Sequence, residues 1–182
     1  MFVWLEWFTV KRKPFLLYIA PKFLFMQTGF VHLHNFLRWI IIVLLLVSIV
    51  KAYSGWSSKQ TFKAADKKIW LFTMIASHIT LLLGLYQVAF GRYGFFTTSL
   101  PEGTSFMKDK FYRFFWMEHP VTMIGAIVFI TLAHGMAKKT VADDVKYKKA
   151  FLFFLIAALL ILAGVPWPFR GEIIGRPLFP GQ

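Results

Sequence analysis

The chain has 182 residues, of which 58% are apolar, with 22 Phe, 7 Trp and a mean hydropathy of +0.60, which excludes an ordinary soluble domain and indicates an integral membrane protein. Cys is absent, and this excludes disulfides, thiolate metal sites, iron–sulfur clusters and covalently attached c-type haem. The formal charge of +13 comes mainly from Lys residues beside apolar segments, where membrane topology and anionic lipid explain them better than nucleic acid does.

Residues 1–25 contain two short apolar pieces, Met1–Val10 and Phe15–Ala20, separated by Lys11-Arg-Lys-Pro14. Each piece is much shorter than the roughly 20 residues that a helix needs to cross a bilayer. We therefore expect an N-terminal extension that lies in the membrane interface. Alternatively, Met26 is the native start and the extension is not part of the protein.

Four later segments have the length and hydropathy of transmembrane helices. They run from about Gly29 to Ala52, Lys68 to Phe90, Phe111 to Lys138 and Tyr147 to Trp167. Segments of about 20 residues match the hydrocarbon thickness of a bilayer. Because the connections are moderate in length, we predict an all-α fold, an integral membrane up-and-down four-helix bundle formed by residues 26–182.

Two of the three connections are rich in lysine. Ten cations lie in the connections between spans one and two and between spans three and four, and six lie in the long connection and the C-terminal tail. By the positive-inside rule, the lysine-rich connections are cytoplasmic and the segment Gly29–Trp39 faces outward. The basic residues of the N-terminal extension argue against this orientation, and a start at Met26 would remove the conflict.

The segment Gly29–Trp39 places several polar groups at the mouth of the first span: His32, His34, Asn35 and Arg38. A charged Arg within a membrane helix costs a few kcal/mol on insertion scales. Arg38 should therefore face a protein interior, a cofactor or an anionic group rather than lipid tails.

His34 and His119 lie at similar depths in spans one and three, roughly 7 Å inside at 1.5 Å per residue. In an up-and-down bundle these spans are diagonal, and a diagonal pair of histidines at one depth can hold both axial positions of a haem b. Such a haem transfers electrons, because it has no open coordination site. Arg38 is four residues after His34 on the same helical face and can neutralise a haem propionate.

Two further histidines leave alternatives open. His32 is about 200° from His34 around the helix, so the two cannot point at the same ligand, and His32 remains a competitor for the axial position. His78, near the middle of span two, can ligate a tilted haem, serve a second site or hydrogen-bond a quinone. Non-haem metal binding, quinone binding and structural hydrogen bonding remain alternatives to haem for the buried histidines.

Other residues in the spans have competing explanations. Glu118 can orient a ligand or accept a proton, or it can cap a helix whose first turn contains Pro120. His134 is interpreted as an interfacial or hydrogen-bonded residue. Small residues at helical spacing on span two indicate close helix packing, and they are Thr73, Ser77, Thr80 and Gly84.

Four motifs stand out along the chain: Gly29–Trp39, Ala76-Ser-His78, Glu118-His119 and Pro166-Trp-Pro-Phe-Arg170. With these motifs the chain resembles, from about Met26 to its C-terminus, small bacterial four-helix membrane proteins commonly labelled cytochrome b-like. The resemblance implies a haem protein or a respiratory-chain accessory protein of the bacterial inner membrane. It places the motif positions of that group on His32, His34, Arg38, His78 and His119.

These residues are consistent with two functions. The first is a b-type cytochrome that passes electrons between a quinol and an outward-facing acceptor, with His34 and His119 as metal ligands and with a cofactor surrounded by Arg38, His78, His32 and Glu118. The alternative is a non-catalytic membrane subunit or assembly factor that holds no haem. A His-rich non-haem metal enzyme is a weaker third class, because such sites gather several His and carboxylates at one depth.

Overall fold

The computed structural model describes residues 3–100 and 102–179, with side chains described from residue 26 onward. Every regular element in this part of the chain is helical. The elements are α1 (Val3–Ser57), α2 (Ala64–Phe90), α3 (Lys110–Arg113), the π-helical turn η1 (Phe114–Glu118), α4 (His119–Met136), α5 (Asp143–Gly164) and the 3₁₀ turn η2 (Pro168–Arg170). The elements α3, η1 and α4 follow one another directly and form one long helix.

Four helical segments are long and apolar enough to cross a membrane: Met26–Ser57, Ala64–Phe90, Lys110–Met136 and Asp143–Gly164. Large apolar side chains on these helices are exposed on the outside of the bundle, as is expected of residues that contact lipid tails. They include Val43, Leu46, Leu82 and Leu159. The prediction of an all-helical, multi-pass four-helix membrane bundle is confirmed.

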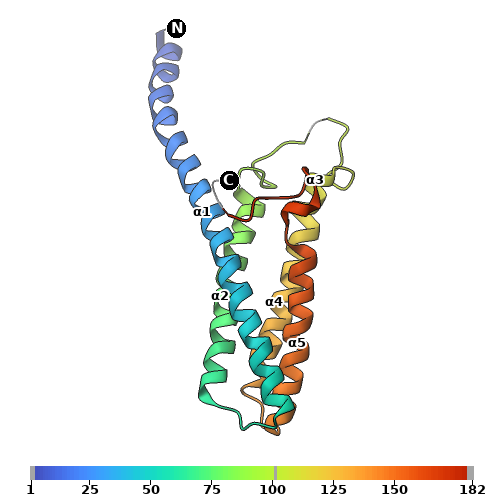
Figure 1. Cartoon of the computed structure of the whole chain (residues 1–182). Helices are drawn as coiled ribbons and strands as arrows, with labels where there is room; N and C mark the ends of the chain where they lie inside the picture. Colours follow the sequence, from blue (N-terminus) through green and yellow to red (C-terminus); the bar gives the residue numbers. More distant parts are fainter. Residues whose placement is uncertain (1–2, 101, 180–182) are drawn as a thin grey trace.

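The four spans form a ring in which each helix packs against two others (Figure 1). The first span, in α1, contacts α2 and α5, and α4 contacts the same two helices. Spans one and three therefore face each other across the bundle axis. This diagonal arrangement is the one that the up-and-down topology requires.

Small residues of α4 and α5 lie in the buried core of the bundle. Ala126 and Ala133 of α4 and Ala150 and Ala157 of α5 are fully buried, with a spacing of seven residues in each helix. Small side chains let membrane helices approach closely and gain van der Waals contact. They are consistent with the close packing of α4 against α5.

The first helix, α1, is continuous over 55 residues. The sequence predicts a separate extension over residues 1–25, but the helix is not interrupted at Lys11–Pro14 or at Gly29. In Figure 1 its N-terminal part extends past the other helices. That residues 1–25 lie in the membrane interface, or precede the native start, stays a prediction.

The two ends of the bundle differ in their polar residues. We call the end with connections 58–63 and 137–142 the lysine end, and the other end the histidine end. At the lysine end, the carboxylate of Asp66 is buried and accepts a hydrogen bond of 2.6 Å from the hydroxyl of Tyr147. Its other oxygen is 3.4 Å from Nζ of Lys51. Gly55 packs against the ring of Tyr147 so closely that a Cβ would lie 2.5 Å from it.

Tyr147→Phe should destabilise the lysine end, because it removes a donor from a buried carboxylate. Hydrogen bonds to charged groups contribute about 1.5–3 kcal/mol, so we expect the free energy of unfolding to fall by about 2 kcal/mol. The melting temperature of the detergent-solubilised protein measures this effect. Tyr53→Phe is the matched control, because Tyr53 is exposed. Equal melting temperatures for the two variants would contradict the stabilising role of the Tyr147 hydroxyl.

The predicted orientation can be tested by labelling, because the chain has no Cys. Ser57 lies at the lysine end, Ser105 lies in the connection at the histidine end, and both are exposed. In intact cells a membrane-impermeant maleimide should label Ser105→Cys, and it should label Ser57→Cys only after permeabilisation. Labelling of both positions from one side would refute the topology.

Candidate cofactor site

At the histidine end the four spans enclose a cavity of about 580 Å³. Cofactor pockets commonly have volumes of about 300–1,000 Å³. The part of the wall deeper in the bundle is mostly apolar and includes Ile41, Ala126 and Ile130. It also holds Ser77 and Thr80, whose hydroxyls donate hydrogen bonds to carbonyls of their own helix. The wall also holds three arginines and three histidines, and no Asp or Glu is among its described residues. The cavity therefore suits an apolar ligand that carries anionic groups.

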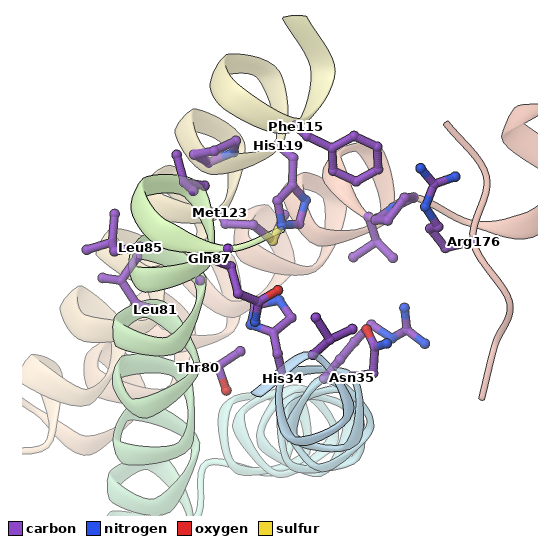
Figure 2. A pocket seen from close by; sticks show the side chains of 18 of the residues that line it. His34, Asn35, Thr80, Leu81, Leu85, Gln87, Phe115, His119, Met123 and Arg176 are labelled. Atoms are coloured by element: carbon purple, nitrogen blue, oxygen red, sulfur yellow. The ribbon is translucent and has the colours of Figure 1, made fainter. Parts of the chain in front are cut away.

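His34 of α1 and His119 of α4 point toward each other across this cavity (Figure 2). Their ring centres are 6.4 Å apart and the ring planes are inclined by 65°. With metal–imidazole bonds of about 2 Å and ~1 Å more from each nitrogen to its ring centre, two imidazoles that ligate one ion from opposite sides have centres about 6 Å apart. The inclination is compatible with this arrangement, because each ring plane has only to contain its own bond to the ion. The pair therefore has the spacing of two ligands to a single metal.

His119 is oriented by the end of α5. Its Nδ1 lies 2.8 Å from the carbonyl oxygen of Gly164. This carbonyl has no helical partner, because α5 ends at Gly164 and Pro168, four residues on, has no N–H. Since the carbonyl can only accept, Nδ1 of His119 carries the proton and Nε2 keeps the lone pair that binds a metal.

The π-helical turn η1 sets the direction of His119. The N–H of His119 bonds to the carbonyl of Phe114, five residues earlier. Pro120 favours this wider turn, because it has no N–H to continue the regular pattern and its ring crowds the preceding turn. Phe114 is buried, and its ring centre lies 6.0 Å from that of His119. Single π-turns occur frequently at functional sites, and this one shields the imidazole with an aromatic ring.

His34 packs against a glycine of the neighbouring helix. A Cβ at Gly84 of α2 would lie 3.2 Å from Cε1 of His34, which is closer than an ordinary contact. Nδ1 of His34 is buried and has no hydrogen-bond partner in the described part of the chain. The backbone of Thr80, one turn before Gly84 on α2, interacts with the same imidazole, so α2 positions the ring of His34 at the cavity wall.

Arg38 lies one helical turn after His34 on the wall of the cavity and is 9% exposed. Its Nη2 donates a hydrogen bond of 2.6 Å to the carbonyl of Leu178, and its buried Nε has no partner among the described residues. None of the ion pairs between described residues includes Arg38. A buried charge without a counter-ion is costly in a membrane, so an anionic group in the cavity would complete this site.

The other two predicted histidines differ in position. His32 is exposed and contributes to the wall of the cavity. His78 is exposed on α2, its Nδ1 lies 2.9 Å from the carbonyl of Met74, and it does not line the cavity. The structure therefore brings His34, His119, Arg38 and His32 to one cavity and leaves His78 outside. A quinone role for His78 stays a prediction.

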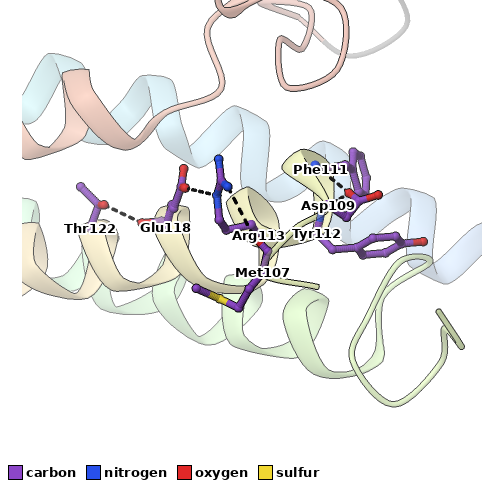
Figure 3. A network of polar contacts seen from close by, with 7 residues as sticks. All are labelled: Met107, Asp109, Phe111, Tyr112, Arg113, Glu118 and Thr122. Carbon is purple, nitrogen blue, oxygen red and sulfur yellow. Dashed lines mark hydrogen bonds and ion pairs between the residues drawn. The ribbon is translucent and has the colours of Figure 1, made fainter. Parts of the chain in front are cut away.

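Glu118 also lies outside the cavity wall. Its carboxylate accepts a hydrogen bond of 2.8 Å from Nε of Arg113, and both side chains are exposed (Figure 3). The alternative that Glu118 caps α4 is wrong: its side chain makes no capping bond, because residue 118 is itself helical within the long third span. Asp109 makes the cap instead, accepting from the N–H groups of Phe111 and Tyr112.

His134 is at the lysine end and is 4% exposed. Its Nδ1 has no hydrogen-bond partner in the described part of the chain. His134 is predicted to be interfacial or hydrogen-bonded, but its Nδ1 is neither exposed nor hydrogen-bonded to a described residue. The reason is that its side chain lies on the face of α4 that is buried in the bundle. His134 does not line the cavity at the histidine end.

Three features of the site are not among the predicted site residues: Gly84, the Gly164 carbonyl and Arg176. Gly84 is predicted to allow close helix packing, and the side chain that packs against it is the imidazole of His34. The Gly164 carbonyl has a signal in the sequence, because Pro166 and Pro168 end the preceding helix and remove its helical donor. Arg176 follows the last span in a segment without periodicity, so only the tertiary structure brings it to the cavity.

The ligand set distinguishes between kinds of metal site. Within the described residues, no group of three or more His, Asp or Glu side chains gathers closely enough to hold a metal ion. Haem iron needs only axial ligands from the protein, because the porphyrin supplies the other four. Two facing histidines therefore suit a haem, and they do not make a non-haem metal site by themselves.

Comparisons with models of protein families, with curated protein sequences and with solved structures found no match. The fold and the cavity alone thus define the class to which the chain belongs. It is a multi-pass, four-helix membrane protein with a basic, cofactor-sized cavity crossed by a pair of facing histidines.

Proposed function

We propose that this protein is a membrane b-type cytochrome of the bacterial inner membrane that binds one haem b and transfers electrons. The observation that carries the proposal is the pair His34 and His119, which face each other from diagonal helices with ring centres 6.4 Å apart. When bound, haem b supplies a reversible one-electron redox couple. Two imidazole ligands leave no open coordination site, and this favours electron transfer over oxygen binding.

Each part of the chain has a defined task in this proposal. His119 presents Nε2 because Nδ1 donates to the Gly164 carbonyl, and His34 presents its ring from the opposite side of the cavity. Arg38 offers a buried positive charge to a carboxylate of the ligand. Apolar side chains, among them Ala126 and Ile130, exclude water from the deep part of the cavity. Low dielectric and fixed ligands together adjust the reduction potential.

We propose that a membrane quinol donates the electrons. We also propose that the electron acceptor, or a subunit of a respiratory complex, binds at the histidine end. Exposed residues reach the cavity wall there, including His32, Arg92 and Phe179. A haem bound between His34 and His119 would therefore lie close to this end of the bundle. Short distances to a partner favour electron exchange on this side.

A haem titration of the purified protein tests the proposal. We expect saturation at one haem per chain and a reduced-minus-oxidised spectrum with sharp α and Soret bands of low-spin haem b. A colourless protein that does not take up added haem would contradict the proposal. It would favour the alternative of a haem-free membrane subunit or assembly factor.

A further inference from the structure

The segment after α5 returns across the histidine end of the bundle and reaches α1 (Figure 1). On the α1 side, Arg38 and Trp39 both donate hydrogen bonds to the carbonyl of Leu178, with lengths of 2.6 and 3.0 Å. The ring of Trp39 also stacks on that of Phe179, with 5.6 Å between centres. The segment is thus held at the helix that carries His34.

The same segment is held on the opposite side of the cavity. The guanidinium of Arg176 lies over the rings of Phe115 and Phe111, at 4.9 and 5.4 Å from their centres. The backbone N–H of Arg176 donates a hydrogen bond of 3.0 Å to the carbonyl of Pro166. Phe111 and Phe115 precede His119 in the third span, so the segment bridges the two helices that carry the histidine pair.

Arg176 lines the cavity together with Arg38 (Figure 2 shows Arg176 beside the cavity). Its Nη1 donates to backbone carbonyls, at 2.7 Å to Gly175 and 3.4 Å to Ile173. None of the ion pairs between described residues includes Arg176, and the described cavity wall contains no carboxylate. Two guanidinium groups that lack a counter-ion among the described residues, one from α1 and one from the C-terminal segment, therefore line the same ligand space.

We infer that Arg38 and Arg176 bind the two carboxylates of the cofactor, so that the C-terminal segment is part of the binding site. This inference rests on the proposed function and specifies its ligand as a tetrapyrrole with free propionates directed toward the histidine end. Guanidinium groups form strong, charge-assisted hydrogen bonds with carboxylates. The buried Nε of Arg38, which has no partner among the described residues, is available for one of them.

The rate of haem loss to excess apomyoglobin tests the role of Arg176. Loss of a hydrogen bond to a charged group should accelerate haem loss about tenfold or more in Arg176→Gln. Arg113→Gln is the matched control, because Arg113 does not line the cavity and pairs with the exposed carboxylate of Glu118. We expect Arg113→Gln to lose haem at nearly the wild-type rate. Equal rates in the wild type and Arg176→Gln would overturn the inference, as would equal acceleration in both variants.

Haem dimethyl ester, in which both carboxylates are blocked, separates charge recognition from packing. The wild type should lose the ester about tenfold or more faster than haem, and Arg176→Gln should show a smaller difference between the two ligands. If Arg176→Gln accelerates the loss of haem and of its ester equally, Arg176 acts through packing and the inference is overturned.

The two proposals fail in different ways in these experiments. A wild-type protein that binds neither haem nor its ester refutes the cytochrome function and the carboxylate contacts together. A wild-type protein that binds both ligands equally well, with a low-spin spectrum, refutes only the carboxylate contacts.

Discussion

His34→Ala and His119→Ala are each expected to abolish low-spin haem in the purified protein. The two rings face each other at 6.4 Å between centres, so each supplies one side of the proposed metal site. Removal of either ring leaves at most a five-coordinate, high-spin haem. Absorption spectra of protein purified with an ample haem supply measure this change.

His78→Ala is the control for these two variants, because His78 is exposed on α2 and does not line the cavity. It should keep the low-spin spectrum at wild-type intensity. A wild-type spectrum in His34→Ala or His119→Ala would exclude that residue as a ligand. Loss of haem in His78→Ala alone would require a different site.

Gly84→Leu is expected to lower haem affinity about tenfold or more with little effect on the helix itself. A Cβ at this position already lies 3.2 Å from the His34 ring, so the larger side chain must displace the imidazole. Leucine has a higher helix propensity than glycine, by somewhat less than the roughly 0.8–1 kcal/mol that separates glycine from alanine, so the helix α2 itself should not be destabilised. Haem titration measures the affinity, and the melting temperature reports on the fold.

Gly135→Leu is the matched control, because a Cβ at Gly135 meets no other atom within 4 Å. It should bind haem as the wild type does. If both glycine variants bind haem equally well, the contact between Gly84 and His34 does not position the ligand.

Much of the fold could be predicted from the sequence, because span length and hydropathy depend on the bilayer more than on tertiary detail. The ends were less accurate: the fourth span was expected to reach Trp167, and α5 stops at Gly164. Pro166 restricts Val165 to an extended conformation, with φ −73° and ψ 138°. This restriction of the residue before proline was readable in the sequence, and it frees the carbonyl that holds His119.

The histidine pair could be predicted because both residues are near the same membrane surface, where a count of residues gives depth without knowledge of helix tilt. The helical face of His78 was also readable. Its neighbour Ser77 belongs to the buried row with Thr73 and Thr80, and His78 lies about 100° away from Ser77 around the helix. Arg176 was not predictable, because it reaches the cavity only through the path of an irregular segment after the last span.

The identity of the two axial ligands can be measured directly by near-infrared magnetic circular dichroism of the ferric protein loaded with one haem per chain. The position of the charge-transfer band distinguishes two imidazole ligands from an imidazole–thioether pair, and Met123, one turn after His119, is the methionine among the described residues of the cavity wall. A band of bis-imidazole ligation is the result expected from His34 and His119. A histidine–methionine band, a high-spin spectrum or a protein that takes up no haem would contradict it.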